Sequence, residues 1–317
     1  MTSPRAAIAA LPSRGYRWWY VDGLSDDGRR GFTAIFLVGS VFSPWLNARA
    51  RRGEAVLPVE HLGVHLALYE DERQVGWTMA EYPATRLDSD ERSLSIGDCH
   101  LRFADDGSLE GEVSTRSAPV FWSGLGLGRA LRGRFRLAPG TSKPPAVELA
   151  RAPDGATHHW QVKTQSAAFA VEFERPGFSF EGRGYHDGNW GHGRLEEAFT
   201  RWSWARFSDG DDARILYAVE PRVGGPRGFL VERERVRTYD AIHGDGVPTG
   251  WGLVSPTSFS VGEHRSNVVR WLDRTPFYAR YVAELEGKQG VGEFLDLDRF
   301  QRGGVQILLR WRAQRRV

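Results

Sequence analysis

The chain has 317 residues, and its 42 basic and 40 acidic side chains give a formal net charge of +2. This near balance excludes a strong positive field along one face, so we expect no nucleic-acid partner. The length allows two packed domains, and the aromatic content of 12% suits either a β-rich core or walls around an apolar ligand.

Several segments alternate apolar and polar residues, which is typical of strands with one solvated face. In chain order they are residues 93–96, 100–103, 133–137, 168–173 and 178–182. Turn signals that contain Asp-Gly separate such segments, at residues 105–107, 153–155, 208–210 and 243–246. The pattern predicts many strands joined by tight turns.

Helical periodicity is weak throughout the chain, and residues 194–200 are the best candidate for a short helix. With 37 Gly and 16 Pro spread along the sequence, an all-β antiparallel barrel or sandwich is favoured over an α/β fold. Gly and Asn cluster between residues 182 and 193. We therefore expect two domains, residues 1–183 and residues 184–317, each large enough for a β-barrel.

The single cysteine, Cys99, excludes a disulfide framework within the chain and suits a reducing compartment, so we expect a cytoplasmic protein. Residues 1–15 lack the apolar stretch of a signal peptide, and the apolar run at residues 34–46 is interrupted and too short to span a bilayer. Membrane contact is expected to be peripheral at most, at the inner membrane, with the basic segment 310–317 as one candidate.

Common cofactor motifs find little support. The Gly-Leu-Gly-Leu-Gly run at residues 124–128 lacks the third glycine of a dinucleotide fingerprint and has no βαβ pattern around it. His61 and His65 lie in a strand-like segment, and the group of His186, Asp187 and His192 offers no further histidine at ligand spacing. We expect no metal site.

The segment 184–191, Gly-Tyr-His-Asp-Gly-Asn-Trp-Gly, is the most informative one. One interpretation is a turn in which Asp187 and Asn189 bond to their own backbone. Another follows from strand geometry, because Tyr185 and Asp187 share a face if the strand from Phe178 continues through them, and we expect that face to carry Phe178, Phe180 or their neighbours. A carboxyl group among aromatic rings loses solvation, so its pKa rises and it can act as an acid near neutral pH.

The sequence resembles the carotenoid 1,2-hydratase family and its lipocalin-like relatives. The similar blocks follow the family's order along most of the chain: residues 15–28, 36–44, 61–69, 77–81, 131–134, 184–191, 195–199, 202–204 and 275–280. The resemblance implies two packed lipocalin-like barrels, an elongated apolar pocket and a reaction without metal or redox cofactor.

The resemblance also implies roles for particular residues. The family's Tyr-x-Asp pair matches Tyr185 and Asp187, and its His-x-Trp pair matches His158 and Trp160. Asp187 is the expected acid, and His158 is expected to orient it or to hold a water molecule. Aromatic and histidine residues are expected to contact the substrate, a hydrophobic isoprenoid or polyene, and they are Trp202, Trp204, His65, Trp190 and Tyr20.

Three functions remain open on these grounds. Hydration of an acyclic carotenoid of the neurosporene or lycopene type would protonate C2, form a tertiary cation at C1 and capture water. A cyclase on a polyene would give an isomer without added water; the segment 186–190 and His65, where the family leads us to expect Asn, keep this alternative open. A carrier of lipocalin type would bind a hydrophobic molecule unchanged, since one fold hosts both carriers and catalysts.

Overall fold

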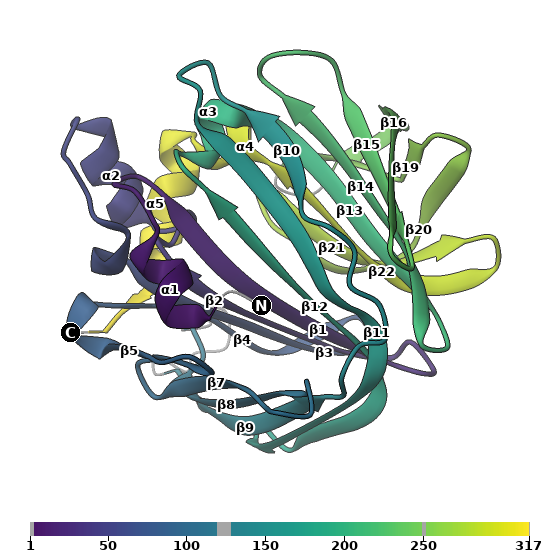
Figure 1. Cartoon of the computed structure of the whole chain (residues 1–317), viewed down its shortest axis with the longest axis horizontal. Coiled ribbons are helices and arrows are strands. Elements are labelled where there is room, and N and C mark those ends of the chain that lie inside the picture. The colour runs from purple at the N-terminus through teal and green to yellow at the C-terminus, as the bar shows by residue number, and fades with distance from the viewer. Residues whose placement is uncertain (1–2, 119–127, 249–251, 317) are drawn as a thin grey trace.

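The computed structural model describes residues 3–118, 128–248 and 252–316. It consists mostly of antiparallel strands, which form a curled sheet and a closed barrel packed against each other (Figure 1). The expected all-β class with two barrel-like units is confirmed. The first unit, however, is an open half-barrel, and only the second closes.

The curled sheet has the strand order β23-β4-β3-β2-β1-β12-β11-β9-β8-β7-β6-β5, and β10 pairs with β11. Its C-terminal strand, β23 (Gln314–Arg315), pairs with β4 in parallel and ties the end of the chain to the first unit. The other strands are β1 (Tyr16–Ser25), β2 (Arg30–Val38), β3 (Leu62–Glu70), β4 (Arg73–Tyr82), β5 (Leu87–Ser89), β6 (Ser93–Ile96), β7 (Cys99–Phe103), β8 (Leu109–Arg116), β9 (Ala130–Leu137), β10 (Val147–Arg151), β11 (Thr157–Arg175) and β12 (Phe178–Gly191).

The closed barrel follows in the sequence, and its first and last strands, β13 and β22, pair with each other. Its strands are β13 (Phe199–Asp209), β14 (Asp212–Pro221), β15 (Arg227–Glu232), β16 (Arg235–His243), β19 (Ser258–Val261), β20 (His264–Arg274), β21 (Tyr278–Leu285) and β22 (Lys288–Asp296). A small separate ribbon consists of β17 (Gly246–Pro248) and β18 (Val254–Pro256).

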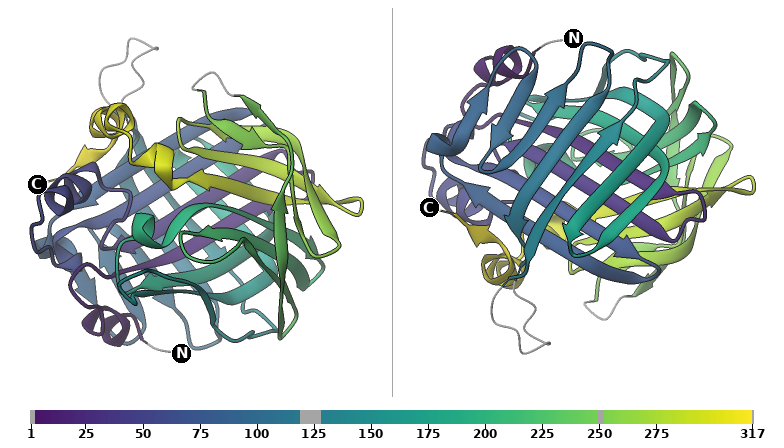
Figure 2. Two further views of the ribbon diagram at one scale, coloured as in Figure 1. Left: turned by 90° about the horizontal axis from the view of Figure 1, so that it is seen from above. Right: turned by 90° about the horizontal axis from the view of Figure 1, so that it is seen from below.

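Helices are short and lie at the edges of the two units (Figures 1 and 2). They are α1 (Pro4–Ala9), α2 (Pro44–Arg51), α3 (Leu195–Ala198), α4 (Leu297–Phe300) and α5 (Gly303–Arg312), with 3₁₀ turns at Pro58–Glu60 and Ala84–Arg86. In the described part of the chain, none of the helices has the length and apolar character needed to cross a membrane.

The strands expected at residues 93–96, 100–103, 133–137, 168–173 and 178–182 are confirmed within β6, β7, β9, β11 and β12. The helix expected at residues 194–200 is the single turn α3, whereas the longer helices α2 and α5 were not predicted. Two glycines open α5 and weaken its helical signal. Residues 124–127 of the Gly-Leu-Gly-Leu-Gly run lie outside the described residues.

The domain boundary expected between residues 183 and 184 falls inside β12, whose residues on both sides pair with β1 and β11. The glycines of this segment serve close packing within the sheet. A Cβ at Gly184 would lie 2.7 Å from the Phe169 ring, and one at Gly191 would lie 2.4 Å from Tyr16. The chain leaves the curled sheet only after β12, and the barrel begins at Phe199.

Replacement of Gly191 by Ala is expected to lower the free energy of unfolding by about 1–3 kcal/mol, because the new methyl group would overlap Tyr16 and His158 in a packed core. Urea unfolding that compares midpoints at constant m-value measures the change. Gly177→Ala is the matched control, since a Cβ added at Gly177 would have no atom within 4 Å beyond its two neighbours in the chain. Equal stability of the two variants would contradict this account of the glycines.

The two units have separate interiors and share a third apolar layer. Along β1, Val21 points into the curled sheet and Tyr20 points to the barrel. Along β13, Phe207 points into the barrel and Trp204 points to the curled sheet. Because each interior is filled by its own side chains, space for a ligand arises in the layer between the units.

Candidate active site

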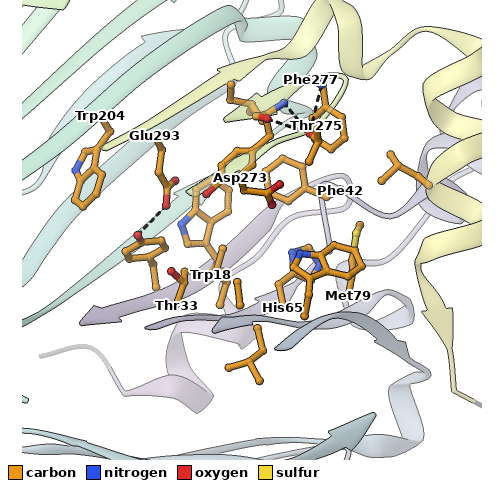
Figure 3. A pocket seen from close by; sticks show the side chains of 18 of the residues that line it. Trp18, Thr33, Phe42, His65, Met79, Trp204, Asp273, Thr275, Phe277 and Glu293 are labelled. Atoms are coloured by element: carbon orange, nitrogen blue, oxygen red, sulfur yellow. Dashed lines mark hydrogen bonds between the residues drawn. The ribbon is translucent and has the colours of Figure 1, made fainter. Parts of the chain in front are cut away.

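An apolar cavity of about 220 Å³ lies between the curled sheet and the outer wall of the barrel. Its lining from the curled sheet includes Trp18, Tyr20, Thr33, His65 and Asp187, and its lining from the barrel includes Trp202, Trp204, Tyr217 and Glu293. Trp204 and Glu293 lie at the end away from the C-terminal helices, which are drawn in yellow (Figure 3). An apolar pocket, which the resemblance implied, is thus formed between the two units.

Asp187 lies in the middle of the curled sheet, between Tyr20 of β1 and Val162 of β11. Its Oδ2 accepts hydrogen bonds from the Tyr185 hydroxyl at 2.8 Å and from Trp160 Nε1 at 2.9 Å. Its Oδ1 accepts one from Asn189 Nδ2 at 3.1 Å. Each of these three donors is a neutral group.

Burial raises the pKa of Asp187 to about 7, and the nearby charges of Glu293 and Asp22 add to the rise. The hydrogen bonds from Tyr185 and Trp160 oppose it, because they stabilise the ionised form. The carboxyl group is therefore substantially protonated at and below neutral pH. It can donate a proton into the cavity that it lines.

The aromatic residues that bury Asp187 differ from the expected ones. Phe178 and Phe180 lie on the opposite face of β12, in the interior of the curled sheet, because they are out of phase with Tyr185 and Asp187. The rings near the carboxyl group come from other strands: Trp160 meets Tyr217 edge to face at 5.1 Å, and Trp204 lies 5.2 Å from Tyr185 and 5.7 Å from Tyr20.

His158 is on the same strand as Trp160 but four residues from Val162, the cross-strand neighbour of Asp187. At about 3.3 Å per residue, His158 is about 13 Å along the strand from the position next to Asp187. The Nδ1 of His158 instead shares a hydrogen bond of 3.0 Å with the Tyr16 hydroxyl, and burial lowers its pKa to about 4. His158 is a neutral core residue that does not touch Asp187.

The remaining expected contact residues divide into two groups. Trp202, Trp204, His65 and Tyr20 line the cavity. Burial lowers the pKa of His65 to about 3, so its ring is neutral and cannot act as an acid at neutral pH. Trp190 points to the opposite face of β12, where it stacks on His159, so we remove it from the expected substrate contacts.

Glu293, Tyr217 and Asn189 belong to the site but were not predicted to act in it. Asn189 follows the same alternation as Tyr185 and Asp187, so the strand period could have assigned it. Glu293 and Tyr217 lie in the barrel, and no local pattern shows that its outer wall faces Asp187. Among the described residues, no three His, Cys, Asp or Glu side chains gather in a way that could hold a metal ion.

Comparison with known proteins identifies the family. The family model described as carotenoid hydratase CrtC matches residues 34–317. The acyclic carotenoid 1,2-hydratase of Thiocapsa roseopersicina is 34% identical over 98% of this chain and 76% of that protein. The enzyme of the same name from Rubrivivax gelatinosus is 29% identical over 97% of this chain and 75% of that protein.

A solved structure of an AttH-like protein from Nitrosomonas europaea matches with a TM-score of 0.59 at 14% sequence identity, over 88% of this chain and 91% of that one. This identity is low, so the structural likeness supports the fold alone. The sequence matches carry the assignment, and the chain belongs to the carotenoid hydratase CrtC family.

Proposed function

We propose that this protein adds water across the terminal C1–C2 double bond of an acyclic carotenoid of the neurosporene or lycopene type, with Asp187 as the acid. The observation that carries the proposal is a buried carboxyl group with a pKa raised to about 7, held by neutral donors at the wall of an apolar cavity. The family assignment supports the same reaction.

In the proposed reaction the π electrons of the double bond take the proton of Asp187 at C2, and a tertiary cation forms at C1. The rings of Trp204, Tyr20 and Trp202 offer π faces in the cavity, and such contacts stabilise a cation by about 0.5–2 kcal/mol each. Trp160 and Tyr185 hold the carboxyl group in position through Oδ2. Water then bonds to C1 and loses a proton.

The test is incubation of the pure protein with lycopene or neurosporene in detergent and ¹⁸O-labelled water, followed by mass analysis. A product heavier by one labelled water supports hydration. A product isomeric with the substrate would support a cyclase, and unchanged substrate retained by the protein would support a carrier. We propose that the reaction needs no cofactor, so activity should survive dialysis against a chelator.

We further propose that the protein takes its substrate from a membrane surface through α5. Ile307, Leu308 and Trp311 on this helix are 59%, 44% and 64% exposed, and Leu308 also lines the cavity. Arg310 and Arg312 flank this apolar face, and residues 299–317 contain no acidic residue. An exposed apolar face with flanking arginines suits an anionic lipid surface.

The double variant Ile307→Ser/Trp311→Ser is expected to bind vesicles that contain anionic phosphatidylglycerol at least about tenfold more weakly, because insertion of one large apolar side chain is worth about 1.5–3 kcal/mol. Co-sedimentation with vesicles measures this. Ile242→Ser is the matched control, since Ile242 is 68% exposed on β16 of the barrel. If both variants lose vesicle binding equally, or if neither loses it, α5 is not the membrane-binding element.

A further inference from the structure

A second carboxyl group, Glu293, faces the cavity from the barrel side. It lies on β22 directly opposite Trp204 of β13, and its side chain keeps 14% of its surface exposed. Its Oε1 accepts a hydrogen bond from the Tyr20 hydroxyl at 2.8 Å, drawn as a dashed line in Figure 3, and forms an ion pair with Arg280 Nη1. Hydration needs a base for the attacking water as well as an acid.

The charges around Glu293 are balanced. Arg206 Nε donates to Asp22 Oδ1 at 2.6 Å, and Arg280 bridges Glu293 and Asp22, with its Nη2 3.8 Å from Asp22 Oδ2. Two guanidinium groups thus accompany two carboxylates. Burial raises the pKa of Glu293, and Arg280 opposes that rise, because arginine stays protonated in proteins and its contact favours the ionised carboxylate. Asp187, in contrast, accepts hydrogen bonds only from neutral donors. Two carboxyl groups at one cavity in such different surroundings suit opposite proton-transfer roles.

Tyr20 offers a way to place an extra proton on Glu293. Its hydroxyl lies 2.8 Å from Glu293 Oε1 and 2.9 Å from Asp22 Oδ2, and it accepts a hydrogen bond from Arg280 Nη1 at 2.9 Å. One phenol proton can serve only one of the two carboxylates at a time. When Glu293 gains a proton, Tyr20 can donate to Asp22, so neither oxygen is left without a partner.

Several buried polar atoms of the residues around Glu293 have no hydrogen-bond partner among the described residues. They include Arg280 Nε and Nη2 and, on two residues that line the cavity, Trp204 Nε1 and Thr33 Oγ1. Trp204 is the cross-strand neighbour of Glu293, and Thr33 is the cross-strand neighbour of Asp22. A water molecule inside a protein needs about 2–4 polar partners, and this wall of the cavity offers an acceptor in the Glu293 carboxylate and donors in the unpaired groups around it.

We infer that Glu293 is the second catalytic residue, which binds the attacking water and takes its proton. The inference rests on the proposed hydration. The π electrons form the C2–H bond with the proton of Asp187, a lone pair of the water forms the O–C1 bond, and the released proton goes to Glu293. Return of that proton through solvent to Asp187 restores both groups, so the sum of the steps is alkene plus water to alcohol.

The experiment compares Glu293→Gln with wild type on the acyclic carotenoid in ²H₂O, and it follows both the water adduct and deuterium in recovered alkene. The variant should form adduct about 10²–10⁴-fold more slowly. Asp187 still transfers a deuteron to C2, and its carboxylate then takes a proton back from the cation, so the alkene returns with deuterium. If Glu293→Gln does not fold, Glu293→Asp takes its place, because it keeps the charge beside Arg280 but shortens the side chain. It should likewise lose adduct formation and keep deuterium exchange into the alkene.

The pH profile gives a second readout. The groups that contact Glu293 are Tyr20, Tyr278 and Arg280, with Asp22 next to them. Asp187, Tyr69, Tyr217 and Tyr281 are further titratable groups near enough for the charge of Glu293 to raise their pKa. Burial raises the pKa of each of these tyrosines, so they stay neutral below pH 7. The rate should therefore fall at low pH as Glu293 becomes protonated, and Glu293→Gln should abolish this fall. Asp273 is another carboxyl group that lines the cavity, and Asp273→Asn should keep it.

Adduct formation by folded Glu293→Gln within threefold of wild type would overturn the assignment. So would loss of both adduct and deuterium exchange, because Glu293 would then be needed before water attacks. Absence of any adduct from wild type would be a failure of the proposed hydration itself, and it is read separately from the comparison of variants.

Discussion

Asp187→Asn is expected to reduce formation of the water adduct by about 10²–10⁴-fold, the usual contribution of a positioned acid. Asparagine has the same shape, and its oxygen can still accept from Trp160 and Tyr185, but it has no proton to give. The assay is ¹⁸O incorporation into the product by the purified variant. Full activity of the variant would exclude Asp187 as the acid.

The wild-type rate should fall as pH rises through about 7, because Asp187 acts in its protonated form. Tyr185→Phe removes a hydrogen bond that favours the ionised carboxylate, so it should move this alkaline limb to higher pH. A merely structural role of Tyr185 would lower the rate without moving the limb.

The same carboxyl group also makes the stability of the fold decrease as pH rises. Its folded pKa of about 7 lies above the unfolded value of about 3.9, so stability is lost as pH rises from about 4 to 7, on the order of 4 kcal/mol in total. Asp187→Asn does not ionise and escapes this loss. Urea unfolding at pH 5 and pH 8 should show the variant gaining stability relative to wild type at the higher pH.

How far the sequence predicts this site depends on the range of the interactions. The alternation along residues 178–191 places Tyr185 and Asp187 on one face, and the structure has them on one face of β12. The same alternation, applied correctly, puts Phe178, Phe180 and Trp190 on the other face. The wrong expectations for Phe178, Phe180 and Trp190 could thus have been avoided from the sequence, by counting residues along the strand.

Other features depend on which surfaces meet, and local patterns do not encode that. Glu293 is the one charged residue within residues 289–295 of β22, and its place opposite Asp187 follows from packing of the barrel wall on the curled sheet. The resemblance suggested that His158 acts with Asp187, but the two side chains have different partners. The position of the cavity between the units could not be predicted either. The alternation of apolar and polar residues along a strand shows that a face is buried, but it does not show which element covers that face.

The ion pair of Asp22 and Arg206 joins β1 of the curled sheet to β13 of the barrel, and both side chains are fully buried. We expect Arg206→Met to lower the free energy of unfolding by about 3–5 kcal/mol, since it leaves the Asp22 carboxylate without its closest cation. Arg134→Met is the matched control, because the Arg134–Glu172 pair lies on the surface and such pairs contribute about 0–1 kcal/mol.

The double variant Asp22→Asn/Arg206→Met separates lost charge balance from lost packing. It removes the buried carboxylate together with its partner, so it should be more stable than Arg206→Met alone, even though it carries one more substitution. Urea unfolding of the four proteins gives the comparison. If Arg206→Met lowers the free energy of unfolding no more than Arg134→Met does, the apolar layer holds the two units together. The buried charges of Asp22, Arg206 and Arg280 then do not stabilise the contact between them.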